Sequence, residues 1–118
     1  LRNKFINLDI KIVLLKQAKL EILDESVYFK GSNIVIYSEL KENSSFELYR
    51  LNKFNQSTEN SYFHKCDLSK DCIFKDFNFT NGSKLMNNET IVSLAEEHAK
   101  YIGSGVVITN STNCNNYF

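Results

Sequence analysis

The residues best suited to chemistry in this chain are its histidines and cysteines. His64 and Cys66 stand two positions apart, so in a β-strand their side chains would share one face. A thiolate beside an imidazole is a nucleophile in covalent catalysis. Side chains at this spacing lie far apart for a direct hydrogen bond, however, and no third residue that would orient the imidazole is evident. We therefore expect Cys66 to be a structural cysteine.

The cysteines predict a disulfide more readily than a metal site. Cys66 and Cys72 enclose the sequence CDLSKDC, and a Cys-x5-Cys pair closes a small loop. Cys114 is left over or pairs with one of them. Structural zinc needs four ligands at a recognisable spacing, and only His64 and His98 are available to join. We expect the disulfide, which points to a location outside the cytosol.

Two other segments invite a chemical interpretation. Glu96, Glu97 and His98 are acid, base or metal-ligand types, but the HExxH spacing is absent. Gly103 and Gly105 precede a strand, whereas phosphate-binding loops follow a strand and open a helix. We therefore predict no catalytic residue, no metal and no cofactor, and a protein that is not an enzyme.

Composition sets the remaining bounds. The chain has 118 residues, a length that suits one domain at residues 1–118, and 42% of them are hydrophobic. Its 14 basic and 14 acidic side chains cancel, so no nucleic-acid partner is expected. No run of 18 apolar residues is present. We find no internal repeat and no linker.

Residues 1–28 have the most distinctive hydrophobic pattern. At 100° per residue the apolar side chains fall on two stripes, which predicts a long helix that packs on its own domain and on something else. The first stripe contains Leu1, Phe5, Leu8, Ile12, Leu15 and Leu23, and the second contains Ile6, Ile10, Val13 and Leu20. The same residues also alternate with period two, as two strands would. We prefer the helix because a hairpin would have to turn at Lys16 and Gln17, without Gly, Asn or Asp.

The rest of the chain reads mostly as strands. A break at residues 30–33 is followed by an expected antiparallel hairpin, with strands 33–40 and 46–51, and then by a long surface loop at 52–70. A strand at 73–80 ends in the turn signal Asn81-Gly82. Residues 89–102 fit either a second helix or a strand at 89–94 followed by a loop, and residues 105–109 fit a buried strand. The expected class is α+β, with the helix at 1–28 packed on an antiparallel sheet within the β-rich region 33–118.

This order of elements resembles the soluble domain of type IV minor pilins and type II secretion minor pseudopilins, the FimT and GspH group. The resemblance rests on LLKQAKLEIL at 14–23, NIVIYS with FELYRL, FNFTNGSKL at 77–85, ETIVSL, YIGSGVVIT at 101–109 and Cys114. It implies that residues 1–28 are the lower part of a longer helix, whose missing upstream half anchors the subunit in the inner membrane.

The resemblance implies a structural subunit of a type IV pilus, competence pilus or secretion pseudopilus, in the periplasm or outside the cell. Its partners would be other pilin or pseudopilin subunits. Its assembly interface would contain Ile6, Ile10, Val13 and Leu20. The alternative is a secreted, disulfide-bonded α+β binding domain. Six glycosylation-type triplets support that alternative, and they begin at Asn43, Asn55, Asn78, Asn81, Asn88 and Asn110.

Overall fold

The computed structural model describes residues 6–94 and 96–108, together with the backbone of residues 113–117. Nine β-strands and no helix occur in this part of the chain. The strands are β1 (Ile6–Leu14), β2 (Lys19–Tyr28), β3 (Ser32–Leu40), β4 (Ser45–Phe54), β5 (Glu59–Leu68), β6 (Ile73–Gly82), β7 (Leu85–Ser93), β8 (Lys100–Ile108) and β9 (Asn113–Tyr117).

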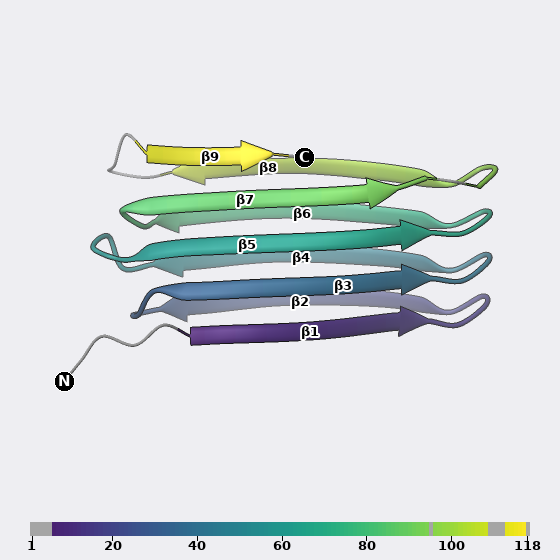
Figure 1. Cartoon of the computed structure of the whole chain (residues 1–118), viewed down its shortest axis with the longest axis horizontal. Coiled ribbons are helices and arrows are strands. Elements are labelled where there is room, and N and C mark those ends of the chain that lie inside the picture. Colours follow the sequence, from purple (N-terminus) through teal and green to yellow (C-terminus); the bar gives the residue numbers. More distant parts are fainter. Residues whose placement is uncertain (1–5, 95, 109–112, 118) are drawn as a thin grey trace.

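Successive strands alternate between two facing sheets. The odd-numbered strands form one sheet in the order β1-β3-β5-β7-β9, and the even-numbered strands form the other in the order β2-β4-β6-β8. Every pairing is parallel, because each strand pairs with the next strand but one along the chain. Ile6 pairs with Ser32 and Ser32 with Asn60, spacings of 26 and 28 residues. The chain therefore winds as a two-sheet parallel β-solenoid (Figure 1).

Tight turns join β1 to β2, β3 to β4 and β5 to β6. At residues 15–18, 41–44 and 69–72 the fourth N–H donates to the first carbonyl over 3.1 to 3.3 Å. The third residue of each turn has positive φ: 65° at Gln17, 61° at Asn43 and 60° at Asp71, and His98 follows at 61°. Asn, Asp and His tolerate this conformation better than most residues. Stacked turns are also bonded to each other, since Gln17 N donates to Glu42 O and Asn43 N donates to Lys70 O.

At the opposite end of the strands, Gly82 occupies a position that only glycine fits. Its φ is 98°, and a Cβ atom there would collide with the carbonyl oxygen of Phe54 on the neighbouring coil. The Asn81-Gly82 turn signal is thus confirmed as the point where β6 ends, although the chain crosses to the other sheet instead of forming a hairpin.

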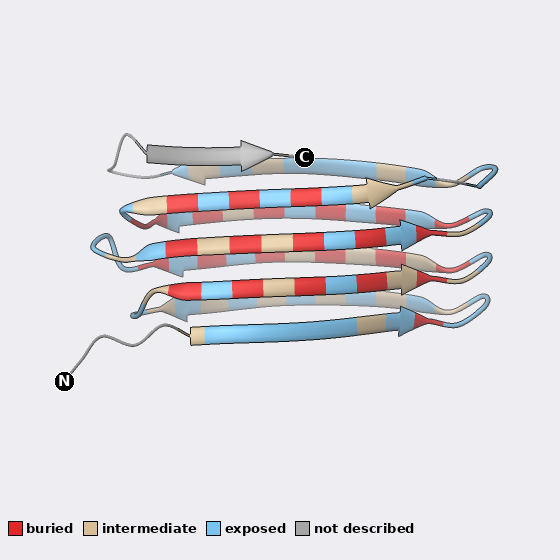
Figure 2. Cartoon of the chain, in the orientation of Figure 1, coloured by how far each residue is buried: buried red, intermediate tan, exposed pale blue. Residues whose placement is uncertain are grey.

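Side chains between the two sheets form the core. Burial alternates along β3 to β7, as Figure 2 shows, so every second residue points inward. Like residues stack from coil to coil: Leu14, Leu40 and Leu68 are all at most 8% exposed. The rings of Phe46 and Phe74 stack with centroids 5.1 Å apart. Burying side chains of this size stabilises the fold by about 1.5–3 kcal/mol each.

The predicted helix at residues 1–28 is wrong. Residues 1–5, including Leu1 and Phe5 of the first stripe, lie outside the described part, and the remainder forms β1, a turn and β2. The period-two alternation was the informative pattern. A hairpin would need Gly, Asn or Asp at Lys16 and Gln17, but the turn at 15–18 connects two different sheets, and Gln17 itself adopts the required positive φ.

The α+β class and the antiparallel sheet are wrong for a related reason. Residues 33–40 and 46–51 do lie in strands, but β3 and β4 belong to opposite sheets and do not pair. The predicted surface loop at 52–70 contains β5. Of the two alternatives for residues 89–102, the strand is confirmed and the helix is wrong, since residues 89–93 belong to β7 and β8 begins at Lys100. The resemblance to pilins and pseudopilins is wrong as well, because their fold requires a long N-terminal helix and the described residues form strands instead. In the described residues no helix is long and apolar enough to cross a membrane.

Candidate functional site

The His64 and Cys66 pair lies inside the solenoid. Both residues are on the inward face of β5 and are fully buried, at 0% exposure. A hydrogen bond of 2.7 Å joins His64 Nε2 to Ser38 Oγ. Burial lowers the pKa of His64 to about 4 and raises the pKa of the Cys66 thiol to about 12. A neutral thiol that solvent cannot reach is not an activated nucleophile, so this pair contributes to packing.

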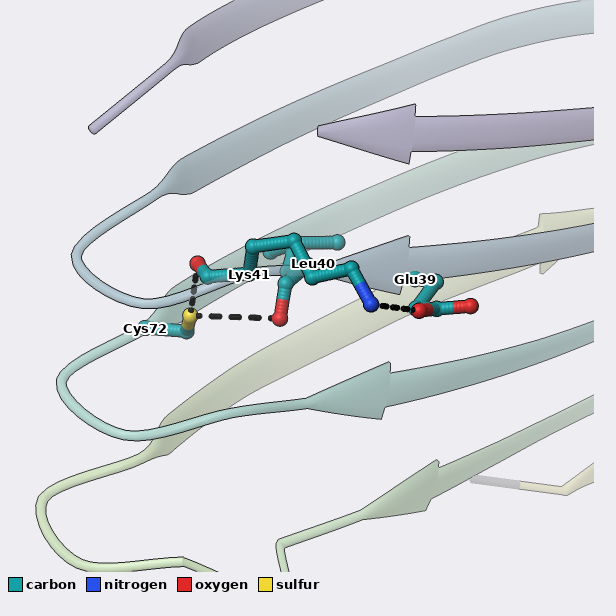
Figure 3. Close-up of polar contacts among 4 residues, drawn as sticks. All are labelled: Glu39, Leu40, Lys41 and Cys72. Atoms are coloured by element: carbon teal, nitrogen blue, oxygen red, sulfur yellow. Dashed lines mark hydrogen bonds and ion pairs between the residues drawn. The ribbon is translucent and has the colours of Figure 1, made fainter. Parts of the chain in front are cut away.

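The predicted Cys66–Cys72 disulfide is also wrong, because both thiols are free and buried. Cys72 is the small inward residue that ends a tight turn, the position of Ser44 one coil earlier. Its Sγ donates to Lys41 O at 2.9 Å and lies 3.6 Å from Leu40 O (Figure 3). Only the backbone of Cys114 is described. The free thiols therefore give no support to a location outside the cytosol, which was inferred from the disulfide.

The segment 96–98 forms part of a turn at the surface. Glu96 Oε2 accepts a hydrogen bond of 2.9 Å from the backbone N of Lys70, which ties two stacked turns together. His98 is exposed and has positive φ. Across the described residues, no three His, Cys, Asp or Glu side chains gather as a metal site would require. These side chains therefore serve the turn.

A buried ionic cluster was not predicted from the sequence. Arg50 and Asp76 face each other inside the solenoid with Nη2 and Oδ1 3.8 Å apart, and the Arg50 guanidinium lies 3.5 Å from the centroid of the Tyr62 ring. Burial raises the pKa of Asp76, and the charge of Arg50 opposes that rise. Burial likewise raises the pKa of Tyr62. The signal that places Arg50 inside is its position in FELYRL, where it follows the buried Phe46 and Leu48 at the same two-residue spacing.

The cluster has little room for a substrate. The adjoining cavity, which Arg50, Asn52 and Tyr62 line together with residues of β1 and β3, measures about 60 Å³. A volume of this size holds a few water molecules. Several buried polar atoms near it have no hydrogen-bond partner in the protein, among them Tyr62 OH and Asn52 Nδ2. The cavity beside this cluster is large enough for water and too small for a metabolite.

Strands β1 and β2 lie at one end of the stack and expose apolar side chains to solvent. We call this pair of strands the edge coil. Leu8 and Ile10 point inward in the same columns as Ile34 and Ile36 of the next coil. Ile34 and Ile36 are 8% and 7% exposed, whereas Leu8 and Ile10 are 41% and 40% exposed. Figure 2 shows the same contrast along β1 and β3. Within the described residues, the core is therefore less covered at this end than at the next coil.

The residues predicted as an assembly interface all lie in the edge coil. Ile10 and Val13 are exposed, at 40% and 45%, and Ile6 and Leu20 are half-buried. Ile10 and Leu20 point inward at the open end of the core, while Val13 lies on the outer face of β1. The structure thus places the four on one coil but on different faces of it, and their role in assembly stays a prediction.

A second surface lies on the outer face of the even-numbered sheet. A groove of about 550 Å³ runs across β2, β4 and β6. Val27, Leu51 and Phe79 supply its apolar lining, and Glu25 and Lys53 supply its charges. Ser26 and Asn52 also line it, and the Ser26 hydroxyl donates to Asp24 Oδ1 at 2.6 Å. A concave, partly apolar lining of this kind suits binding.

Comparison with known proteins assigns the chain to no family. No protein-family model, no curated protein and no solved structure matches the chain.

Proposed function

We propose that the chain is a non-catalytic assembly module, which associates with a partner polypeptide through its edge coil. The observation that carries the proposal is the exposure of Leu8 and Ile10, about five times that of their column neighbours Ile34 and Ile36. Solvent-exposed apolar side chains at the open end of a core are a common mark of an interaction surface.

The backbone of β1 supports the same conclusion. Ile6 N donates to Gly31 O at 2.8 Å and Leu14 O accepts from Lys41 N at 2.9 Å, so even-numbered residues of β1 direct their backbone groups toward β3. In a parallel ladder, alternate residues direct both groups to opposite sides. Asn7, Asp9, Lys11 and Val13 therefore direct their N–H and C=O groups away from β3, to a side where no other described strand lies. Such groups are a template for an added strand.

The proposal keeps the expectation of a structural, non-enzymatic subunit but not the helical interface on which it was based. The buried His64 and Cys66, with an uncharged imidazole and thiol, support a non-catalytic role. An anchor in the inner membrane, a periplasmic or extracellular location and the lack of a nucleic-acid partner stay predictions.

Photo-crosslinking from two matched positions tests the proposal. Val13 on β1 and Ile91 on β7 are β-branched, face outward on the same sheet and are 45% and 43% exposed. With benzoylphenylalanine at each position in the native host, we expect crosslinks to another polypeptide from position 13 and none from position 91. Equal crosslinking from both positions, or none from position 13, would show that the edge coil is not a docking site.

A further inference from the structure

The outer face of the even-numbered sheet exposes more apolar surface than the outer face of the odd-numbered sheet. Among the described residues, eight large hydrophobic side chains are exposed on the first face and three on the second. The eight are Leu23, Val27, Leu51, Ile73, Phe77, Ile102, Val106 and Ile108. Parallel sheets are normally covered on both faces, and an apolar surface of this extent marks an interaction site.

Six residues at the centre of this face form three rows across β4 and β6. Their side chains point outward, because each alternates with a buried residue along its strand. β4 and β6 each have a described strand on either side, so the rows lie within the sheet and not at its edge. The rows are Glu47 beside Lys75, Tyr49 beside Phe77, and Leu51 beside Phe79.

We infer that a second copy of this chain packs on this face, about a two-fold axis that runs parallel to the strands and midway between β4 and β6. β4 of each copy then lies over β6 of the other in the same register. Acid faces base in the first row, aromatic faces aromatic in the second, and Leu51 faces Phe79 in the third. This interface uses a different surface from the edge coil and goes beyond the proposed function.

The outer strands of the sheet fit the same axis. β2 of each copy lies over β8 of the other, which places Val27 opposite Ile108. The like charges of Lys19 and Lys100 also come opposite each other, but both residues stand at the first position of their strands and are exposed to solvent, which screens them.

Neighbouring axes and the opposite face of the solenoid lack this match. An axis between β2 and β4 would place Glu21 opposite Glu47. On the outer face of the odd-numbered sheet, an axis between β3 and β5 would place Glu39 opposite Asp67. Like charges that meet in an interface suppress association. Self-complementarity therefore selects β4 and β6, and a two-fold contact between identical copies is the case that requires it.

The size of the face predicts a weak dimer. Four strands about 4.8 Å apart, each with about ten residues of about 3.3 Å, cover roughly 600 Å². A dimer would bury roughly 1,200 Å² in total, which is the lower limit for a specific interface. The dissociation constant is therefore expected in the micromolar range.

Exchange of the charges in the first row tests the axis by sedimentation equilibrium. Glu47→Lys and Lys75→Glu each place like charges opposite each other, so each is expected to raise the dissociation constant about tenfold or more. The double exchange should restore the wild-type constant. An equimolar mixture of the two single variants should form a heterodimer, because both of its charge pairs are again opposite in sign. Both side chains are partly exposed, so these changes leave the core intact.

An apolar substitution tests the face itself. Leu51→Asp is expected to leave the chain monomeric throughout the micromolar range, because the carboxylate would lie opposite Phe79. Ile91→Asp on the outer face of the odd-numbered sheet is the matched control, since Leu51 and Ile91 are 37% and 43% exposed. The control should dimerise like wild type, and circular dichroism of both variants checks that the strands are retained.

Three solution results would overturn the inference. They are a wild-type monomer throughout the micromolar range, a mixture of the single charge variants that does not associate, and an Ile91→Asp variant that weakens association as much as Leu51→Asp. Benzoylphenylalanine in place of Phe79 identifies the occupant in the native host: crosslinks to a second copy support the inference, and crosslinks to a different polypeptide, or none, overturn it. Crosslinks from position 13 test the edge coil alone, so failure of one proposal is distinguishable from failure of the other.

Discussion

Arg50 and Asp76 form an ion pair that is sealed inside the solenoid, with Nη2 and Oδ1 3.8 Å apart and side chains that are 3% and 0% exposed. They stand on neighbouring strands β4 and β6, and Tyr62 from the opposite sheet covers the guanidinium. Burial of both charges is costly, so the pair is balanced only while both partners are present.

Removal of one partner is expected to be far more harmful than removal of both. Arg50→Met or Asp76→Leu alone should lower the free energy of unfolding by about 3–5 kcal/mol, since each leaves a buried charge unpaired. The double variant should lose much less than the sum of the two. Urea denaturation of the four proteins measures this cycle, and additive losses would show that the two side chains are not coupled.

The exposed pair Lys75 and Glu47 provides a control for that cycle. Its Nζ and Oε1 atoms are 3.9 Å apart at the outer surface of the same two strands. Lys75→Met is expected to change the free energy of unfolding by less than about 1 kcal/mol, because surface ion pairs contribute little.

His64 should make the folded state sensitive to acid. Its pKa is lowered from 6.5 to about 4 by burial, so the unfolded chain binds a proton more readily between these values. The stability that this group contributes is present above pH 6.5 and is lost as the pH falls toward 4, by roughly 3 kcal/mol. The pKa of Asp76 is raised, so its contribution to the free energy of unfolding changes with pH in the opposite direction. Asp76 is present in wild type and in His64→Gln alike, so its contribution cancels in their difference.

The difference between wild type and His64→Gln isolates this contribution. Denaturant titrations from pH 7 to about pH 4 should show the wild type losing stability relative to the variant. His98→Gln, at an exposed turn, is the matched control. A constant difference between wild type and His64→Gln would contradict the role assigned to His64.

Gln17 should be the least favourable residue among the stacked turns. It has a φ of 65°, where a glycine has no steric penalty and where Asn43 and Asp71 occupy the equivalent positions. Gln17→Gly is expected to raise the free energy of unfolding by about 0.5–1 kcal/mol, measured by urea denaturation. Gln17→Val, a β-branched residue, should lower it, and equal stability of the two variants would argue against strain at this turn.

Cys66 and Cys72 should resist alkylation until the chain unfolds. Both thiols are 0% exposed. Under native conditions iodoacetamide should leave the peptides that contain them unmodified, and after denaturation without reductant both should react fully. Protection that persists in denaturant and disappears with reductant would instead reveal a disulfide.

Strand positions could be predicted from this sequence, but strand partners could not. Alternation of buried and exposed residues is local, so residues 33–40, 46–51 and 73–80 were recognisable as strands. Parallel pairing joins residues 26 to 28 positions apart and leaves no local sign. The repeat itself was hidden because its length varies from coil to coil. Its traces are the leucines at 14, 40 and 68 and the phenylalanines at 46 and 74.

The excess of apolar residues in residues 1–28 is real, but the helix to which it was assigned is wrong. Ile6, Ile10, Val13 and Leu20 were selected because residues 1–28 hold more apolar surface than one helix face needs. The edge coil has the same excess, because within the described residues no other coil covers its inner face. The buried polar residues were missed: Asn78 and Asn88 read as glycosylation triplets, yet they are 0% and 3% exposed. Asn110 lies outside the described residues.

The stacking of coils also determines how the molecule would respond to force. β1 and β9 occupy opposite ends of one sheet, and the hydrogen bonds between strands run along the stack (Figure 1). A pull along that direction loads one inter-coil ladder at a time, as in opening a zipper. Each released coil of about 27 residues would add roughly 90 Å of extended chain. The same ladders that lock the register therefore make the solenoid extend one coil at a time, in steps that differ only by the one or two residues by which the coils differ in length.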